Sequence, residues 1–190
     1  KGHTMPSFTK KAIKESFLKL LNERPLNQIT VKDIVEDCGI NRNSFYYHFQ
    51  DLPALAEEIV KENTDRIIAE HAATSTIEEC LDVAIDFALK NRRAALHLYN
   101  SASRETFEQH LSALCRHAVT EYVDTVLAGR SVGESDKALL ITFFKCQLFG
   151  QIIEWLGDGM RYDLRGQFHR ICELMEGSAE AAFDRCALPK

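Results

Sequence analysis

The side chains best suited to specific chemistry lie close together in residues 41–48, which read Asn-Arg-Asn-Ser-Phe-Tyr-Tyr-His. Arg42 carries a planar fork of donors that fits the acceptor edge of guanine, and Asn43 can pair with adenine in the same two-point fashion. Serine and tyrosine hydroxyls suit phosphate oxygens, as do lysines such as Lys32. This set of residue types indicates hydrogen bonding to nucleic acid.

Two short helices joined by a tight turn would have to position these side chains. Thr30–Asp33 has the pattern of a capping box that opens a helix, and that helix must end near Gly39, which readily takes a left-handed backbone conformation. Asn41 can cap the next helix. The apolar residues that would lock the two helices together are Ile34, Val35, Ile40 and Phe45. This is the helix-turn-helix layout, whose second helix enters the major groove of DNA.

The remainder of the chain is also predicted to be helical. A first helix capped by Thr9 precedes the pair, and Asp51 caps a longer helix with Pro53 in its first turn, where a missing N–H costs little. Apolar residues recur at helical spacing in five later segments, 76–89, 91–101, 105–127, 135–156 and 164–182. No segment alternates with a period of two, so the expected fold class is all-α.

Composition and charge limit the classes of protein to consider. The chain has 190 residues, of which 45% are hydrophobic and 27% charged, as is typical of a folded domain rather than a disordered one. Residues 1–50 carry eight Lys and Arg against five Asp and Glu, whereas residues 51–190 carry fifteen against twenty-three. A mildly basic head on an acidic body suits a protein that meets phosphates at one end only.

Several function classes find no support in the sequence. No apolar run approaches the roughly 18 residues of a membrane span and no leader is evident, so a cytoplasmic protein without membrane contact is expected. The six cysteines lie far apart without a C-x-x-C pair, which favours small buried hydrophobes. A nucleophile elbow, a phosphate loop and an H-E-x-x-H motif are all absent from the sequence, so no enzyme activity, cofactor or metal is predicted.

The stretch from Thr30 to Leu55, above all Gly39–Phe49, resembles the signature of the TetR/AcrR transcriptional regulators. The resemblance implies an N-terminal three-helix DNA-binding domain and a C-terminal helical domain for effector binding and dimerisation. It also implies a homodimer that reads a palindromic operator on double-stranded DNA, with an unknown small-molecule or protein effector. Carried onto this chain, it assigns DNA contacts to Thr30, Lys32, Arg42, Asn43, Ser44, Tyr46, Tyr47 and His48.

Two positions depart from the pattern of that family. Leu52 stands where the family often has a lysine, so one phosphate contact would be missing. Val35 stands where alanine is favoured, which would alter how closely the two helices pack. The segment Glu154–Met160 resembles a smaller branch, related to the activator of dihydroxyacetone kinase operons. In such a branch a protein partner could replace the small-molecule effector, and activation could replace repression.

The predicted domains follow from this resemblance. Residues 1–4 precede Met5 and are interpreted as a tag remnant, and residues 5–52 as the helix-turn-helix domain. Residues 51–73 form a linking helix, and residues 74–190 an effector and dimerisation domain.

Two further sites are predicted in the C-terminal helices. Polar groups mixed into apolar faces suggest a ligand pocket, lined by Tyr99, Phe107, His110, His117, Phe144, Gln147 and Gln151. A stripe on the last two long helices, where Gly150 permits close approach, predicts a four-helix dimer interface formed by Leu148, Ile152, Trp155, Phe168, Ile171, Met175 and Ala179. The two histidines of the pocket are seven residues apart and lack an intervening ligand, so no metal site is predicted.

Two functional hypotheses of different classes follow. The first is a TetR-like regulator, interpreted as a repressor, whose operator affinity is switched by an effector bound in the C-terminal domain. Its variant is an activator or partner-binding adaptor controlled by a protein. The second is a helical enzyme or adaptor that has kept the head only as structure. Loss of DNA binding in Asn43→Ala and Tyr46→Ala, with the fold intact, would separate the two.

Overall fold

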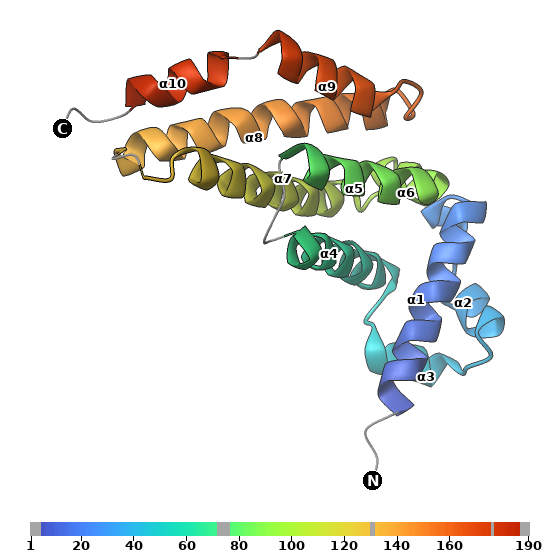
Figure 1. The fold of residues 1–190 in the computed structure, drawn as a ribbon. Helices are drawn as coiled ribbons and strands as arrows, with labels where there is room; N and C mark the ends of the chain where they lie inside the picture. The colour runs from blue at the N-terminus through green and yellow to red at the C-terminus, as the bar shows by residue number, and fades with distance from the viewer. Residues whose placement is uncertain (1–4, 72–76, 130–131, 176, 187–190) are drawn as a thin grey trace. The chain divides into compact units, whose positions relative to one another are not determined.

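The computed structural model describes residues 5–71, 77–129, 132–175 and 177–186, and every secondary-structure element in these ranges is helical (Figure 1). The elements are α1 (Met5–Glu23), the 3-10 turn η1 (Leu26–Gln28), α2 (Val31–Asp37), α3 (Arg42–His48), α4 (Leu52–His71), α5 (Ile77–Lys90), α6 (Arg92–Tyr99), α7 (Arg104–Val126), α8 (Glu134–Gly157), α9 (Leu164–Leu174) and α10 (Ser178–Cys186). The all-α fold class is therefore confirmed. The interpreted tag residues and the end of the linking helix, residues 72–73, lie outside the described ranges.

By packing, the chain divides into two compact units. The first, called the head unit, comprises Lys1–Asn63 and Lys90–His110, and the second, the body unit, comprises Thr64–Leu89 and Leu111–Lys190. The head unit therefore includes α6, because α6 packs on α1 although about 70 residues of sequence separate them. The domain boundaries near residues 52 and 74 stay predictions, since a compact unit need not be continuous in sequence.

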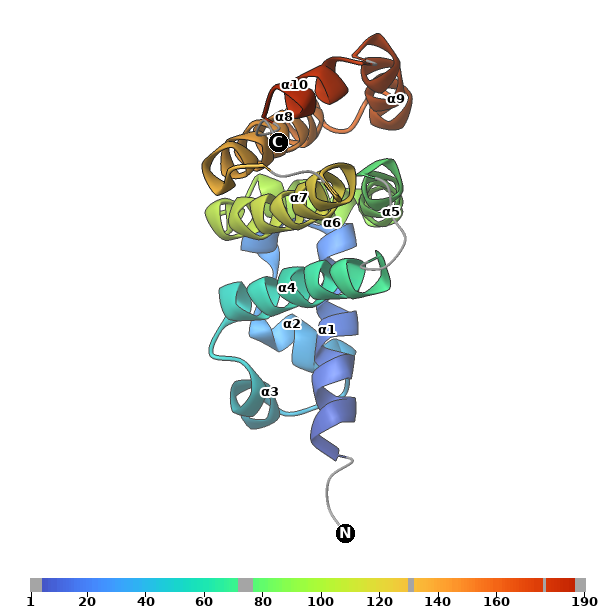
Figure 2. The same cartoon turned by 60° about the vertical axis from the view of Figure 1, so that its left-hand side comes forward.

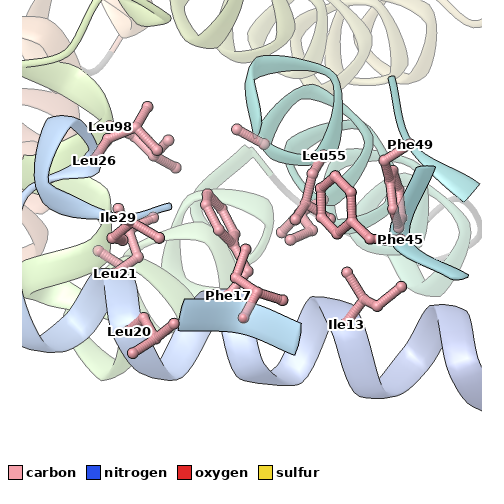
Figure 3. Close-up of a cluster of buried hydrophobic side chains, with 14 of the residues drawn as sticks. Ile13, Phe17, Leu20, Leu21, Leu26, Ile29, Phe45, Phe49, Leu55 and Leu98 are labelled. Atoms are coloured by element: carbon pink, nitrogen blue, oxygen red, sulfur yellow. The ribbon is translucent and has the colours of Figure 1, made fainter. Parts of the chain in front are cut away.

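The core of the head unit gathers apolar side chains from α1, η1, α2, α3, α4 and α6 (Figure 3). Ile13, Phe17 and Leu21 follow one another at helical spacing along α1 and are fully buried. Phe45 of α3 and Leu55 of α4 meet them and are equally inaccessible. This core fixes α3 on α1 and so determines which side of α3 faces the solvent.

The start of α1 differs from the sequence prediction. Thr9 was expected to cap the helix, but α1 already begins at Met5, so the predicted start is wrong by about one turn. Pro6 lies in the first turn, where its missing N–H removes no helical hydrogen bond and its fixed φ favours the helix.

The end of the chain also differs. One continuous helix was expected over residues 164–182, but α9 ends at Leu174 and α10 begins at Ser178. Gly177 between them has φ +76°, a left-handed conformation that ends a helix, and the Ser178 N–H donates to the Met175 carbonyl at 2.9 Å. The prediction was wrong because the apolar residues keep their helical spacing across the break between α9 and α10.

One described helix, α8, is long and apolar enough to cross a membrane, judged by length and composition only. The central helix of a soluble protein can pass the same test. The inward side of α8 carries the buried residues Leu148, Ile152, Trp155 and Leu156, whereas Leu139 and Phe143 on its other side are exposed. Helix α8 is therefore apolar on two sides, of which one is packed within the body unit and one is open.

Candidate DNA-binding interface

The capping box at the start of α2 is formed as the sequence predicts. The Asp33 N–H donates to the Thr30 hydroxyl oxygen at 3.3 Å, and the Thr30 N–H donates to the Asp33 carboxylate at 2.8 Å. The Thr30 hydroxyl also donates to that carboxylate at 2.7 Å. Thr30 therefore sets the start of α2, and its side chain is engaged within the head unit.

The turn between α2 and α3 depends on Gly39. Its φ of +68° lies in the left-handed region, and the Ile40 N–H reaches back to the Val35 carbonyl at 3.0 Å, which closes the end of α2. Asn41 then caps α3, because its side-chain oxygen accepts the Ser44 N–H at 2.8 Å and the Ser44 hydroxyl at 3.1 Å. The starts of both short helices and the end of α2 therefore agree with the sequence prediction.

Of the residues assigned to DNA contact on α3, four are exposed. They are Arg42, Asn43, Tyr46 and Tyr47, with Tyr46 55% and Tyr47 78% exposed. The anchor of α3 is Phe45, which is 0% exposed. A tyrosine left this open in a unit with a well-formed core is available to a partner molecule.

The remaining assigned residues are less free. Ser44 is half-buried and its hydroxyl takes part in the cap of α3. His48 is also half-buried, with its ring edge-on to that of Tyr47 at a centroid distance of 5.0 Å. Lys32 is exposed on α2, where its Nζ lies 3.7 Å from Glu36. Ser44 and His48 therefore interact with neighbours in α3 and its cap, whereas Lys32 is open to solvent.

The two departures from the family pattern have structural counterparts. Val35 is buried at 6% exposure and belongs to the head core. Leu52 is half-buried and packs against that core at the start of α4. Leu52 thus contributes an apolar contact at a position where a lysine would contribute charge.

Asp33 gives the head unit a contribution to stability that depends on pH. The hydrogen bonds from the Thr30 side chain and backbone, followed by the nearby Arg24, hold the pKa of the Asp33 carboxyl below its usual value. A carboxyl with a lowered pKa stabilises the fold above its unfolded pKa of about 4, and this stabilisation is lost as the pH falls through the lowered value.

Thr30→Ala is expected to lower the free energy of unfolding by about 1 kcal/mol at pH 7, since it removes the cap of α2. The acid transition should move to higher pH, because Asp33 loses the bond that contributes most to its lowered pKa. Thermal and acid unfolding followed by circular dichroism would measure both changes. Thr120→Ala is the control, because its hydroxyl bonds a carbonyl four residues earlier inside α7. An equal loss of unfolding free energy in Thr30→Ala and Thr120→Ala would contradict the assignment of Thr30 as the cap of α2.

The residues of the predicted pocket are divided between the two units. In the head unit, Tyr99 is buried beneath the Arg104 guanidinium, which lies 4.2 Å from the ring centroid and donates to the hydroxyl at 2.9 Å. Phe107 packs against the head core, and His110 Nε2 lies 3.9 Å from a Glu57 carboxylate oxygen. These three residues all make contacts within their own unit.

In the body unit, the pocket residues are His117, Phe144, Gln147 and Gln151. His117 is half-buried, and Phe144 packs edge-on to Tyr122 with centroids 6.3 Å apart. Gln147 is exposed. The side-chain oxygen of Gln151 is buried and has no hydrogen-bond partner among the described residues. Gln151 therefore presents an unused acceptor inside the body unit.

The residues of the predicted dimer interface also differ in exposure. Leu148, Ile152, Trp155 and Phe168 are buried within the single chain. The Trp155 ring N–H donates to the Tyr162 carbonyl at 2.9 Å, so Trp155 is held by its own subunit. Ile171 is half-buried, Met175 is 54% exposed, and Ala179 lies on α10.

Sequence reasoning missed the apolar residues that are open on this part of the chain. Leu139 and Phe143 on α8 and Leu174 on α9 are 65%, 56% and 65% exposed. With Cys146 and Gly150, both exposed, the two α8 residues step by four, three and four along one side of the helix. We call the side formed by Leu139, Phe143, Cys146 and Gly150 the outer α8 stripe.

A capped recognition helix, held by a buried phenylalanine and exposing arginine, asparagine and tyrosine, defines a helix-turn-helix regulator. The sequence pattern of the family described as bacterial regulatory proteins, tetR family, matches residues 17–59. That of the family described as transcriptional regulator C-terminal region matches residues 75–177, more than half of the chain. The chain belongs to the TetR family of transcriptional regulators.

Individual relatives agree with this family. An uncharacterized HTH-type transcriptional regulator of Bacillus subtilis, YxbF, is 31% identical over 58 residues, which cover 30% of this chain and 15% of that protein. Among solved structures, the dihydroxyacetone kinase operon activator DhaS has a TM-score of 0.74 at 17% identity, over 91% of this chain and 97% of that one. FadR from Bacillus subtilis, solved with stearoyl-CoA, has a TM-score of 0.59 at 17% identity, over 87% and 96%. At such identities the likeness shows a shared fold.

Proposed function

We propose that this regulator is a homodimeric, cytoplasmic repressor that reads a palindromic operator with α3 and is released by an effector bound in the body unit. The observation that carries the proposal is the exposure of Arg42, Asn43 and Tyr46 on a helix that is anchored by the fully buried Phe45. Two such helices must lie about 34 Å apart, or a multiple of that, to enter successive major grooves. An effector that favours another spacing lowers operator affinity by its differential binding to the two states.

Fluorescence anisotropy with DNA from upstream of the protein's own gene tests the proposal, with random duplex of equal length as competitor. Saturable binding that survives the competitor, and weakens steeply as salt rises, would support it. Binding no tighter than to random DNA would count against autoregulation, and then against sequence recognition if a wider set of duplexes also failed.

The outer α8 stripe is the surface that we propose for dimerisation. Leu139 and Phe143 present a large apolar area to solvent, which in a folded unit marks a contact site. A second copy of the same stripe, related by a twofold axis, would bury it symmetrically. The proposal moves the centre of the interface from Trp155, which its own subunit encloses, to the opposite side of α8.

Cys146 makes this dimer testable. It is exposed on the outer α8 stripe, so two copies are expected to lie close together across a twofold axis through the middle of α8. A short bis-maleimide should convert most of the protein to a covalent dimer, and Cys146→Ser should prevent it. Cys172→Ser is the control, because Cys172 lies on α9 and is half-buried. Cross-linking that persists in Cys146→Ser, or that is lost only in the control, would contradict this interface.

The effector is proposed to bind beside Gln151. Its buried, unpaired side-chain oxygen needs a donor that the described residues do not supply. A ligand with an apolar body and one hydrogen-bond donor fits that need. The solved structure of FadR from Bacillus subtilis, which has this fold, is a complex with stearoyl-CoA, and this favours a ligand with a long apolar chain here.

Gln151→Leu is expected to raise the free energy of unfolding by about 1 kcal/mol without effector, because a buried acceptor without a partner costs about 1–3 kcal/mol. Chemical denaturation would measure the change. Gln147→Leu is the matched control, since Gln147 lies one turn earlier on α8 and is exposed, so it should be nearly neutral. A Gln151→Leu variant less stable than wild type would show that the oxygen is satisfied in solution.

An activator controlled by a protein partner is the second candidate. The observation that favours it is the likeness of the whole chain to DhaS, named as an operon activator, at a TM-score of 0.74. The segment Glu154–Met160 carries the same resemblance in sequence. A reporter gene downstream of the operator separates the two, because deleting a repressor raises its expression and deleting an activator lowers it.

A further inference from the structure

Four charged side chains of the head unit form a cluster between α1 and α4. Lys10 and Lys14, one turn apart on α1, both pair with the same carboxylate of Glu58 on α4, the Lys14 Nζ at 2.7 Å. Lys14 also pairs with Glu62, one turn further along α4. Two cations of α1 are thus neutralised by two anions of α4.

Lys14 and Glu58 are both charged at neutral pH. Partial burial alone would lower the pKa of Lys14, but its bonds to Glu58 and Glu62 outweigh burial and raise it. Burial alone would raise the pKa of Glu58, but Lys10 and Lys14 together lower it. The cluster is therefore a set of ion pairs and not a set of neutral hydrogen bonds.

The cluster lies beside the DNA-reading helix. The Lys10 Nζ is 5.6 Å from the centroid of the Phe49 ring, and Phe49 is the C-cap residue directly after α3. Figures 1 and 2 both show the N-terminal half of α1 next to α3. The side chains of Lys10 and Glu58 are 37% and 28% exposed, so solvent and phosphate reach this pair.

Residues 51–63 also offset the positive charge of residues 1–50. Residues 1–63 contain nine Lys and Arg and nine Asp and Glu, although residues 1–50 alone have an excess of Lys and Arg. Phosphate binding is driven by free lysines and arginines that displace counterions from DNA. A lysine already paired with a carboxylate must exchange that partner for a phosphate, and it gains less by doing so.

We propose that Glu58, assisted by Glu62, limits the DNA affinity of this regulator by holding Lys10 and Lys14 in ion pairs and away from the DNA phosphates. The inference rests on the proposed binding of DNA through α3. It assigns Glu58 the role of a positioning residue that acts through two lysines. Low affinity for random DNA would follow, which leaves discrimination to the base-reading side chains of α3.

Glu58→Gln tests the inference directly, with random duplex DNA and a range of salt concentrations. Binding should tighten several-fold at low salt, and the plot of log affinity against log salt should steepen by about 1–2, at about 0.9 for each phosphate newly neutralised. Glu62→Gln should have a smaller effect, because Glu62 pairs with Lys14 alone. Glu121→Gln is the control, since it changes the net charge equally on an exposed site of α7 in the body unit.

Lys10→Gln completes the test, and its effect in the wild-type background does not depend on the fold of Glu58→Gln. In the wild-type background it should change DNA affinity little. In the Glu58→Gln background it should remove at least half of the added salt slope, because Lys14 keeps its pair with Glu62. A large loss of affinity in Lys10→Gln alone would show that Lys10 already contacts phosphate, and would overturn the inference. So would a folded Glu58→Gln variant with unchanged affinity and slope. If neither wild type nor Glu58→Gln bound any DNA, the proposed function would fall as well.

Discussion

Asn43→Ala is expected to weaken operator binding by about ten- to a hundredfold, because a two-point contact to a base contributes about 1–3 kcal/mol of discrimination. Binding to random duplex should change little, since phosphate contacts carry the affinity for unrelated sequences. The melting temperature should stay within a degree or two of wild type, because Asn43 is exposed. Anisotropy titrations with both duplexes at one salt concentration would give the two affinities.

The control for this prediction is Asn27→Ala, an exposed asparagine on η1. It should leave both affinities unchanged. If Asn43→Ala weakened operator and random DNA by the same factor, Asn43 would contact the backbone and not a base. If it changed neither, α3 would not be the reading helix and the proposed function would be wrong.

Phe45→Ala is expected to lower the free energy of unfolding of the head unit by about 3–5 kcal/mol, the range for removing a fully buried phenylalanine. Phe45 is 0% exposed and contacts Phe49 at a centroid distance of 5.9 Å. Because the total stability of a domain is about 5–15 kcal/mol, this loss should leave much of the head unit unfolded at 37 °C and abolish DNA binding. Guanidinium unfolding, followed by amide exchange at α1–α3, would locate the loss.

Tyr47→Ala is the matched control for Phe45→Ala, since it removes an aromatic ring two residues away that is 78% exposed. Its cost in stability should stay below about 0.5 kcal/mol, as for most surface substitutions. Comparable losses in the two variants would mean that Phe45 does not anchor α3. A Phe45→Ala variant that kept full DNA binding would lead to the same conclusion.

The caps and the turn of the helix-turn-helix could be predicted because they depend on residues that are close together in the sequence. Short segments of sequence determine three of these features, because the residues involved are at most five apart. The features are the capping box at Thr30, the left-handed Gly39 and the cap at Asn41. The exposure of Tyr46 opposite Phe45 follows from helical periodicity once these ends are fixed. These features are confirmed.

Features that depend on distant residues could not be predicted in this way. Gly177 breaks the last helix without altering the apolar step, and only the backbone conformation reveals it. The pairing of Lys14 with Glu58 joins residues 44 apart and requires the packing of α1 on α4. The sequence of α8 shows apolar residues on two sides, and only the fold shows that Trp155 faces inward and Phe143 outward.

The most direct test of the central claim is selection of binding sites from a library of random duplex DNA by the purified protein, followed by sequencing. A dimer that reads DNA with two copies of α3 should enrich an inverted repeat whose half-site centres lie about 10 base pairs apart or a multiple of that. The Asn43→Ala protein should lose the enrichment at defined positions within each half-site. Failure of the wild-type protein to enrich any motif, or equal enrichment by the variant, would contradict sequence-specific recognition through α3.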